Sequence, residues 1–171
     1  MGATRRSLAL LAIAGLALFA AASASAKGPP IVNETMHFAN ETDVFVDVNP
    51  CDPSQEAEIT SSDTGVIHFS LFADGTVHIT GTIRSTVSFD FLPTDGTPDG
   101  TGRTVVWFGT NGKIDPDTGE AFGKGETSFT FTAHLTLTDG TRISFHQVGH
   151  IVFDATGIVK LEFFKERAHC G

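Results

Sequence analysis

Histidines are the side chains of this 171-residue sequence with the most evident capacity for chemistry, because imidazole binds metal ions and transfers protons near neutral pH. His68 and His78 are expected to lie diagonally across one β-hairpin, and His134 and His146 across another. Diagonal neighbours are roughly 7–8 Å apart, which is close enough to share a metal ion. No third ligand has a fixed spacing from either pair, so we expect solvent-facing histidines and no metal site.

Acidic residues are the second source of possible chemistry. The segment DPDTGE at 115–120 has carboxylates at alternating positions, as calcium loops do, but no Glu follows at the required distance. We expect turns there, and we expect the other acids on outer strand faces and in loops. The sequence also lacks the motifs G-x-S-x-G, H-E-x-x-H and C-x-x-C. It therefore predicts no catalytic residue and no cofactor.

Polar groups on an inward strand face are the remaining candidates for a functional site. Gln147 is expected to face inward, and Arg103 and Trp107 join it if the odd-numbered face of their strand is the inner one; the even-numbered face is the alternative. Inward glycines, Gly81 and Gly149, would leave space beside them. We predict an apolar cavity in which Gln147, Arg103 and Trp107 contact a small apolar ligand. The competing interpretation is a filled interior.

Strands must position these side chains, because alternation with period two dominates after residue 26. In the segment 76–91, most odd positions are apolar and the even positions are polar. The segment 126–138 repeats the pattern. Such alternation is expected of a sheet that buries one face only. Further strands are predicted at 36–38, 44–48, 57–71 and 104–109, with the segment 57–71 broken near 61–65.

Three turns of similar form connect strands, and each contains a glycine: Ala73-Asp74-Gly75, Thr138-Asp139-Gly140 and Ala155-Thr156-Gly157. A three-residue hairpin loop usually ends on a residue with positive φ, where glycine is favoured. Because loop length determines register, each turn predicts which residues pair. The predicted pairs are Leu71 with Val77, Phe69 with Ile79, Leu135 with Ile143, Ala133 with Phe145, Phe153 with Val159, Ile151 with Leu161, Gly149 with Phe163, and His150 with Glu162.

The predicted fold is all-β: an antiparallel up-and-down (meander) β-barrel of about eight strands, with a β-sandwich as the alternative. Fifteen Phe and no Tyr suit a dry interior, because a Tyr hydroxyl would need a partner there. Eight of these phenylalanines are expected on the inner face: Phe69, Phe89, Phe91, Phe129, Phe131, Phe145, Phe153 and Phe163.

Residues 1–26 are predicted to be a secretory signal peptide, with Arg5 and Arg6 before an apolar run and Ala24-Ser25-Ala26 at the cleavage site. The expected mature chain, 27–171, is a single barrel domain that is secreted and has no membrane contact after cleavage. Export favours a disulfide between Cys51 and Cys170, which would close a loop stabilising the fold by roughly 5 kcal/mol. The net charge of −9 argues against nucleic-acid binding.

Three segments carry a resemblance to known proteins: Asp47-Val48-Asn49-Pro50-Cys51, the run 101–109 (TGRTVVWFG) and Ser144-Phe145-His146. Through them the chain resembles small secreted actinobacterial β-barrel proteins of unassigned function. The architecture resembles lipocalin, avidin and allene-oxide-cyclase-like barrels, although fold alone does not give function. We predict a secreted protein that binds a small apolar ligand. The alternatives are a structural or surface-interaction module with a filled core, and an isomerase or cyclase acting on an apolar substrate.

Overall fold

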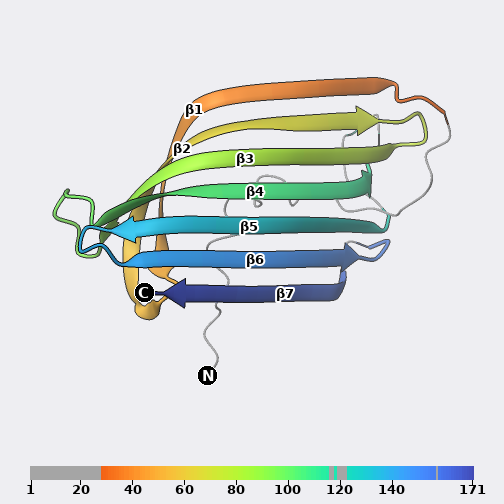
Figure 1. Ribbon diagram of the computed structural model, residues 1–171. Coiled ribbons are helices and arrows are strands. Elements are labelled where there is room, and N and C mark those ends of the chain that lie inside the picture. The colour runs from red at the N-terminus through yellow and green to blue at the C-terminus, as the bar shows by residue number, and fades with distance from the viewer. Residues whose placement is uncertain (1–27, 116–117, 119–122, 157) are drawn as a thin grey trace.

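The computed structural model describes residues 28–115, 118, 123–156 and 158–171, which form one antiparallel sheet of seven strands (Figure 1). Each strand pairs with the next one along the chain, so the predicted all-β meander is confirmed. β1 and β7 form the two edges of this sheet, and no pairing between them closes it within the described residues, so a barrel is not confirmed. The strands are β1 (Val32–Asn49), β2 (Asp52–Leu71), β3 (Thr76–Phe91), β4 (Gly100–Lys113), β5 (Gly125–Leu137), β6 (Arg142–Phe153) and β7 (Val159–Cys170).

The structure has fewer and longer strands than predicted. β1 contains both short strands expected at 36–38 and 44–48, and β2 is unbroken where an interruption was expected. The interruption expected from the polar run near Ser61 is absent because that run pairs without a shift with β3, while the irregularity opposite it lies in β1. In β1 the register shifts between Ala39 and Glu41, where Asn40 has a φ of 58°. Such a β-bulge bends a strand and increases its local twist.

The first two predicted hairpins are confirmed. The hydrogen bonds from Phe72 N–H to Thr76 O (2.8 Å) and from Leu137 N–H to Thr141 O (2.9 Å) each close a three-residue loop. Gly75 and Gly140 have the expected positive φ, 79° and 89°. The four predicted pairs in these hairpins are observed: Leu71 with Val77, Phe69 with Ile79, Leu135 with Ile143, and Ala133 with Phe145.

The third predicted register is correct only beside its turn. Phe153 pairs with Val159 as expected, but the register then shifts by one residue. Gly149 consequently pairs with Phe164, so the predicted pairing of Gly149 with Phe163 is wrong, as are those of Ile151 with Leu161 and His150 with Glu162. Phe163 was expected inside, but it is 49% exposed, and Phe164 packs against the Phe129 ring instead (centroids 5.9 Å apart).

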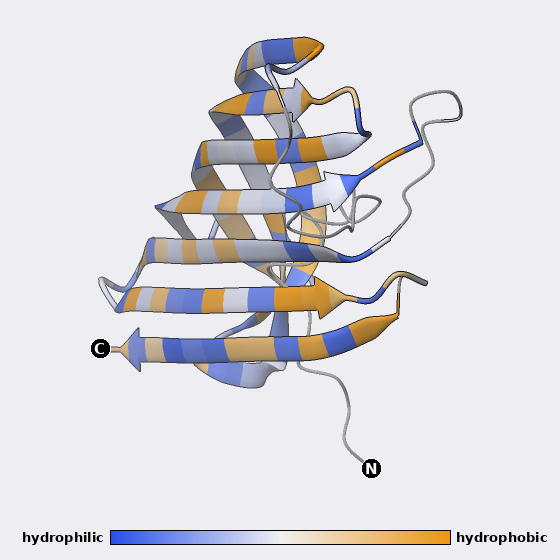
Figure 2. Cartoon of the chain, turned by 90° about the vertical axis from the view of Figure 1, so that its right-hand side faces the viewer, coloured by the Kyte–Doolittle hydropathy of each residue, from blue (hydrophilic) through white to orange (hydrophobic). Residues whose placement is uncertain are grey.

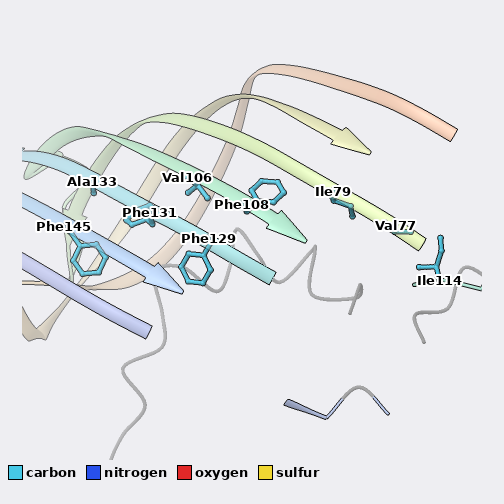
Figure 3. Close-up of a cluster of buried hydrophobic side chains, with 9 residues drawn as sticks. All are labelled: Val77, Ile79, Val106, Phe108, Ile114, Phe129, Phe131, Ala133 and Phe145. Atoms are coloured by element: carbon cyan, nitrogen blue, oxygen red, sulfur yellow. The ribbon is translucent and has the colours of Figure 1, made fainter. Parts of the chain in front are cut away.

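The core lies on the concave face of the sheet, where apolar side chains from β3 to β6 meet (Figure 3). Figure 2 shows the alternation behind this as hydrophobic and hydrophilic bands along the strands. Gly81 and Gly149 face inward as expected, but a Phe ring from a neighbouring strand covers each of them. Phe108 occupies the space at Gly81, and Phe129 the space at Gly149. The room predicted beside these glycines is therefore filled.

The end of β1 and the beginning of β2, which the β1–β2 turn joins, bend away from the rest of the sheet and approach the C-terminal end of β7 (Figure 1). The predicted disulfide holds them there: Cys51, in the β1–β2 turn, is bonded to Cys170, with 6.1 Å between the Cα atoms. Disulfides are typical of proteins that fold in oxidising compartments outside the cytoplasm. The segment predicted as a signal peptide lies outside the described residues. The described part of the chain contains no helix long and apolar enough to cross a membrane.

Candidate ligand-binding cavity

A cavity of about 140 Å³ lies on the concave side of the sheet. One wall comes from β1, the β1–β2 turn and the adjoining part of β2, and the rest from β3 to β6. An apolar cavity of about 150 Å³ is large enough to hold benzene. The bend of the first hairpin therefore encloses space for a compact aromatic or aliphatic group.

Most of the lining is apolar, and five Phe residues contribute to it. Cross-strand pairing explains how they come together, because residues paired across a sheet point to the same face. Phe45 pairs with Ile59, which pairs with Phe89, while Ala57 pairs with Phe91. From the other end of the sheet come Phe131 and Phe145. Four of the eight phenylalanines predicted on the inner face line this cavity, and Phe45, which was not predicted there, joins them. The phenylalanines of the lining are Phe45, Phe89, Phe91, Phe131 and Phe145.

Asp47 is the most deeply buried acid of the cavity lining, with only 3% of its surface exposed. Its Oδ1 accepts a hydrogen bond of 2.6 Å from Val48 N–H, and its Oδ2 is buried without a partner among the described residues. Burial raises the pKa of Asp47 from 3.8 to about 6, against the lowering effect of the Val48 hydrogen bond. A buried carboxylate oxygen without a donor is costly, so this atom marks a place where a ligand's donor would be favoured.

Asp43 and Asp63 also line the cavity, so the expectation that all acids lie on outer faces or in loops is wrong. Asp63 Oδ1 is buried, and no described residue gives it a hydrogen bond; Ser85 on β3 is the cross-strand neighbour of Asp63. The alternation of Val44 and Val46 in β1 favours the opposite orientation, with valines inside. In the structure both valines are exposed and Asp47 is buried. The register with β2 places Asp47 and Phe45 beside apolar residues of the inner face, while Val44 and Val46 pair with Thr60 and Glu58.

Gln147 faces inward as predicted and is 7% exposed, but it does not line the cavity. Its Nε2 donates a 2.8 Å hydrogen bond to Glu166 Oε1 on β7, and its own Oε1 has no partner within the part of the chain that the structure describes. Phe131, its cross-strand neighbour, and Phe145, two residues earlier on β6, both line the cavity. Gln147 therefore lies in the layer of side chains next to the lining.

Arg103 and Trp107 lie on the outer face of β4, so the inward orientation expected for them is wrong. Trp107 is 47% exposed and its indole lies beside Gly109. The inner face is the even-numbered alternative, with Thr104 and Val106 in the cavity lining. This orientation is favoured because it buries Val106 and Phe108 together with the aromatic side chains of β5. With Arg103 outside, Asp47 is the buried titratable group that the cavity offers.

Four histidines, His68, His78, His146 and His150, contact polar side chains of neighbouring strands. His78 Nδ1 is 2.5 Å from Asn111 Oδ1, and His150 Nδ1 is 2.8 Å from Ser128 Oγ. His146 contacts Thr132 across the β5–β6 pair. Among the described residues, no three metal-ligating side chains converge. Most of the acidic segment 115–120 lies outside the described residues.

The pKa of Asp47 makes a prediction about stability. Because the folded protein holds this proton more tightly than the unfolded chain does, the stabilisation is complete below about pH 4 and is lost as the pH rises through about 6. The shift corresponds to about 3 kcal/mol at most, and partial hydration of the cavity reduces this to about 1–2 kcal/mol. Urea unfolding of the protein and of Asp47→Asn, compared between pH 4 and pH 7, should show the variant gaining relative stability by this amount. If the stabilities of the unaltered protein and of Asp47→Asn changed in parallel with pH, this prediction would be wrong. Glu58→Gln, on the outer face of β2, is the control for the loss of one negative charge.

Comparison with known proteins finds no matching family model, no matching curated protein and no matching solved structure. The resemblance to secreted actinobacterial proteins therefore stays a prediction, and the cavity is the feature of the molecule that bears on function.

Proposed function

We propose that the protein is an exported binding protein whose Phe-lined cavity holds a small, compact apolar ligand. One observation carries the proposal: the cavity of about 140 Å³ between the bent β1–β2 hairpin and the sheet. This cavity is partly open to solvent, so a small ligand can enter it while the strands keep their positions. Its lining is mainly aliphatic and aromatic with a few polar groups, as is typical of ligand sites.

Binding of a neutral aromatic probe tests this proposal. We expect 2-phenylethanol to bind the purified protein with a dissociation constant of about 0.1–1 mM, given the affinity that so small a ligand can reach. Ligand-observed NMR and calorimetry would measure it. Ala133→Leu adds three carbons inside the cavity and should weaken binding at least tenfold, because Ala133 is a buried lining residue.

Thr136→Leu is the matched control, because Thr136 lies on the same strand but is exposed on the outer face. It should leave probe binding unchanged. Ser85→Leu, at a half-buried lining position, is a second blocking variant in case Ala133→Leu does not fold. Absence of binding, or binding that both blocking variants leave intact, would overturn the proposal.

An interaction module is the second candidate function, and the edge strand β7 is the observation that favours it. Apolar side chains of β7 are exposed, among them Leu161 (52%) and Phe163 (49%). An exposed apolar edge strand can pair with another chain or complete a barrel by pairing with β1. We propose the closed, lipocalin-like barrel only as the form that pairing of β7 with β1 would produce. Protection of the β7 amides from hydrogen exchange would reveal that pairing.

A further inference from the structure

Asp47 Oδ2 is the atom of the cavity whose capacity to accept hydrogen bonds is least satisfied. It belongs to a residue with only 3% of its surface exposed, and no group in the described part of the chain donates a hydrogen bond to it. The other carboxylate oxygen is already occupied by Val48 N–H. An ionised carboxylate accepts hydrogen bonds only, so the missing partner must be a donor.

Aromatic rings line the cavity on the same face of the sheet as this carboxylate. Asp47 pairs with Ala57, which in turn pairs with Phe91, so these side chains form one row across β1, β2 and β3. Phe45 precedes Asp47 by two residues on the same face, and Phe89 packs edge-on against Phe91 with ring centroids 5.6 Å apart. The faces of aromatic rings attract cations, and this attraction strengthens where water is excluded.

From these two features together we propose that the cavity selects a primary ammonium ion carried on a compact apolar body, and that Asp47 binds the ammonium. This inference rests on the proposed function and specifies its ligand class. An ammonium supplies the N–H donor that Oδ2 lacks, and a charge-assisted hydrogen bond of this kind is roughly twice as strong as a neutral one. A quaternary ammonium would lack the donor.

Charge within the cavity favours a cation throughout. The titratable side chains of the lining are Asp43, Asp47 and Asp63, from β1 and β2, while β3 to β6 contribute apolar side chains and hydroxyls. No Lys, Arg or His belongs to the described lining. Asp63 pairs with Glu41, six residues before Asp47 on β1, which is about 20 Å along a straight strand. Asp43 is four residues before Asp47, or about 13 Å along a strand. An ammonium bound to Asp47 therefore contacts neither of the other two carboxylates, and Asp47 is the buried one of the three.

Three probes of nearly equal shape test the inference: phenethylammonium, 2-phenylethanol and phenylacetate, titrated by calorimetry at about pH 7.5, where Asp47 is ionised. We expect the ammonium to bind at least tenfold more tightly than the alcohol, and phenylacetate to bind more weakly than either. Lowering the pH to about 5 should weaken ammonium binding several-fold and leave alcohol binding unchanged, because a proton then occupies Asp47.

Asp47→Asn should reduce the preference for ammonium over alcohol to less than threefold while alcohol binding persists, which also shows that the variant is folded. Glu58→Gln removes a negative charge from the outer face of the neighbouring strand and should keep the full preference. If the alcohol binds and the ammonium has no advantage, or if Asp47→Asn keeps that advantage, the ammonium inference is wrong and the proposed function stands. If none of the probes binds, the proposed function itself fails.

Discussion

Replacing both Cys51 and Cys170 by serine is expected to lower the free energy of unfolding by about 2–5 kcal/mol. The bond joins residues 119 positions apart, so its loss frees nearly the whole described chain in the unfolded state. It also releases the β1–β2 turn from the end of β7. That turn is otherwise held by local contacts, such as the 2.9 Å hydrogen bond from Cys51 N–H to Asn49 Oδ1.

Urea unfolding followed by circular dichroism measures this loss. The double variant should also bind 2-phenylethanol more weakly, because Asn49 and Pro50 of the released turn line the cavity. Reducing the disulfide of the unaltered protein should reproduce both effects, while the same reductant should leave the double variant unchanged. A double variant that unfolds at the same urea concentration and binds the probe equally well would show that the hairpin holds its position without the bond.

Regular parts of the fold could be predicted from the sequence because turn length and alternation specify the same register. Around Asp74 and Asp139, each loop has three residues and each apolar face meets another. Each aspartate also accepts a hydrogen bond from the N–H two residues later, which explains why Asp occupies this turn position. Two independent local constraints therefore agreed, and both hairpins were predicted correctly.

Bulges explain most of what could not be predicted. An extra residue in a strand exchanges the inward and outward faces for the rest of that strand. The β6–β7 register shifts between Val152 and Phe153, and the β1–β2 register shifts at Asn40; neither place has a distinctive sequence pattern. The shift in the β6–β7 pairing moves Phe163 outward. The shift in the β1–β2 pairing precedes the segment of β1 that contains Asp47. A carboxylate on an inner face also contradicts the expectation that acids stay in water, so the sequence alone favoured Gln147 as the polar group of the site.

Phe108→Ala is expected to lower the free energy of unfolding by about 3–5 kcal/mol, because it leaves a cavity in the core. Gly81→Ala should cost about 1–3 kcal/mol by overpacking, since its new methyl group meets the Phe108 ring. In the Phe108→Ala background, the same methyl group enters the vacated space. Gly81→Ala should then be neutral or stabilising, because alanine restricts the unfolded chain more than glycine does.

The double-mutant cycle therefore measures whether Gly81 is present to accommodate an aromatic ring. Its coupling energy should be about 1–3 kcal/mol, in favour of the double variant. The control cycle combines Gly81→Ala with Phe131→Ala, a core substitution on β5 that removes no atom beside Gly81, and it should be additive. If Gly81→Ala destabilises both backgrounds equally, Phe108 does not occupy this position. If Gly81→Ala is instead neutral in both backgrounds, space remains beside Gly81, as the sequence first suggested, and a ligand could reach further along the inner face than the cavity next to Asp47.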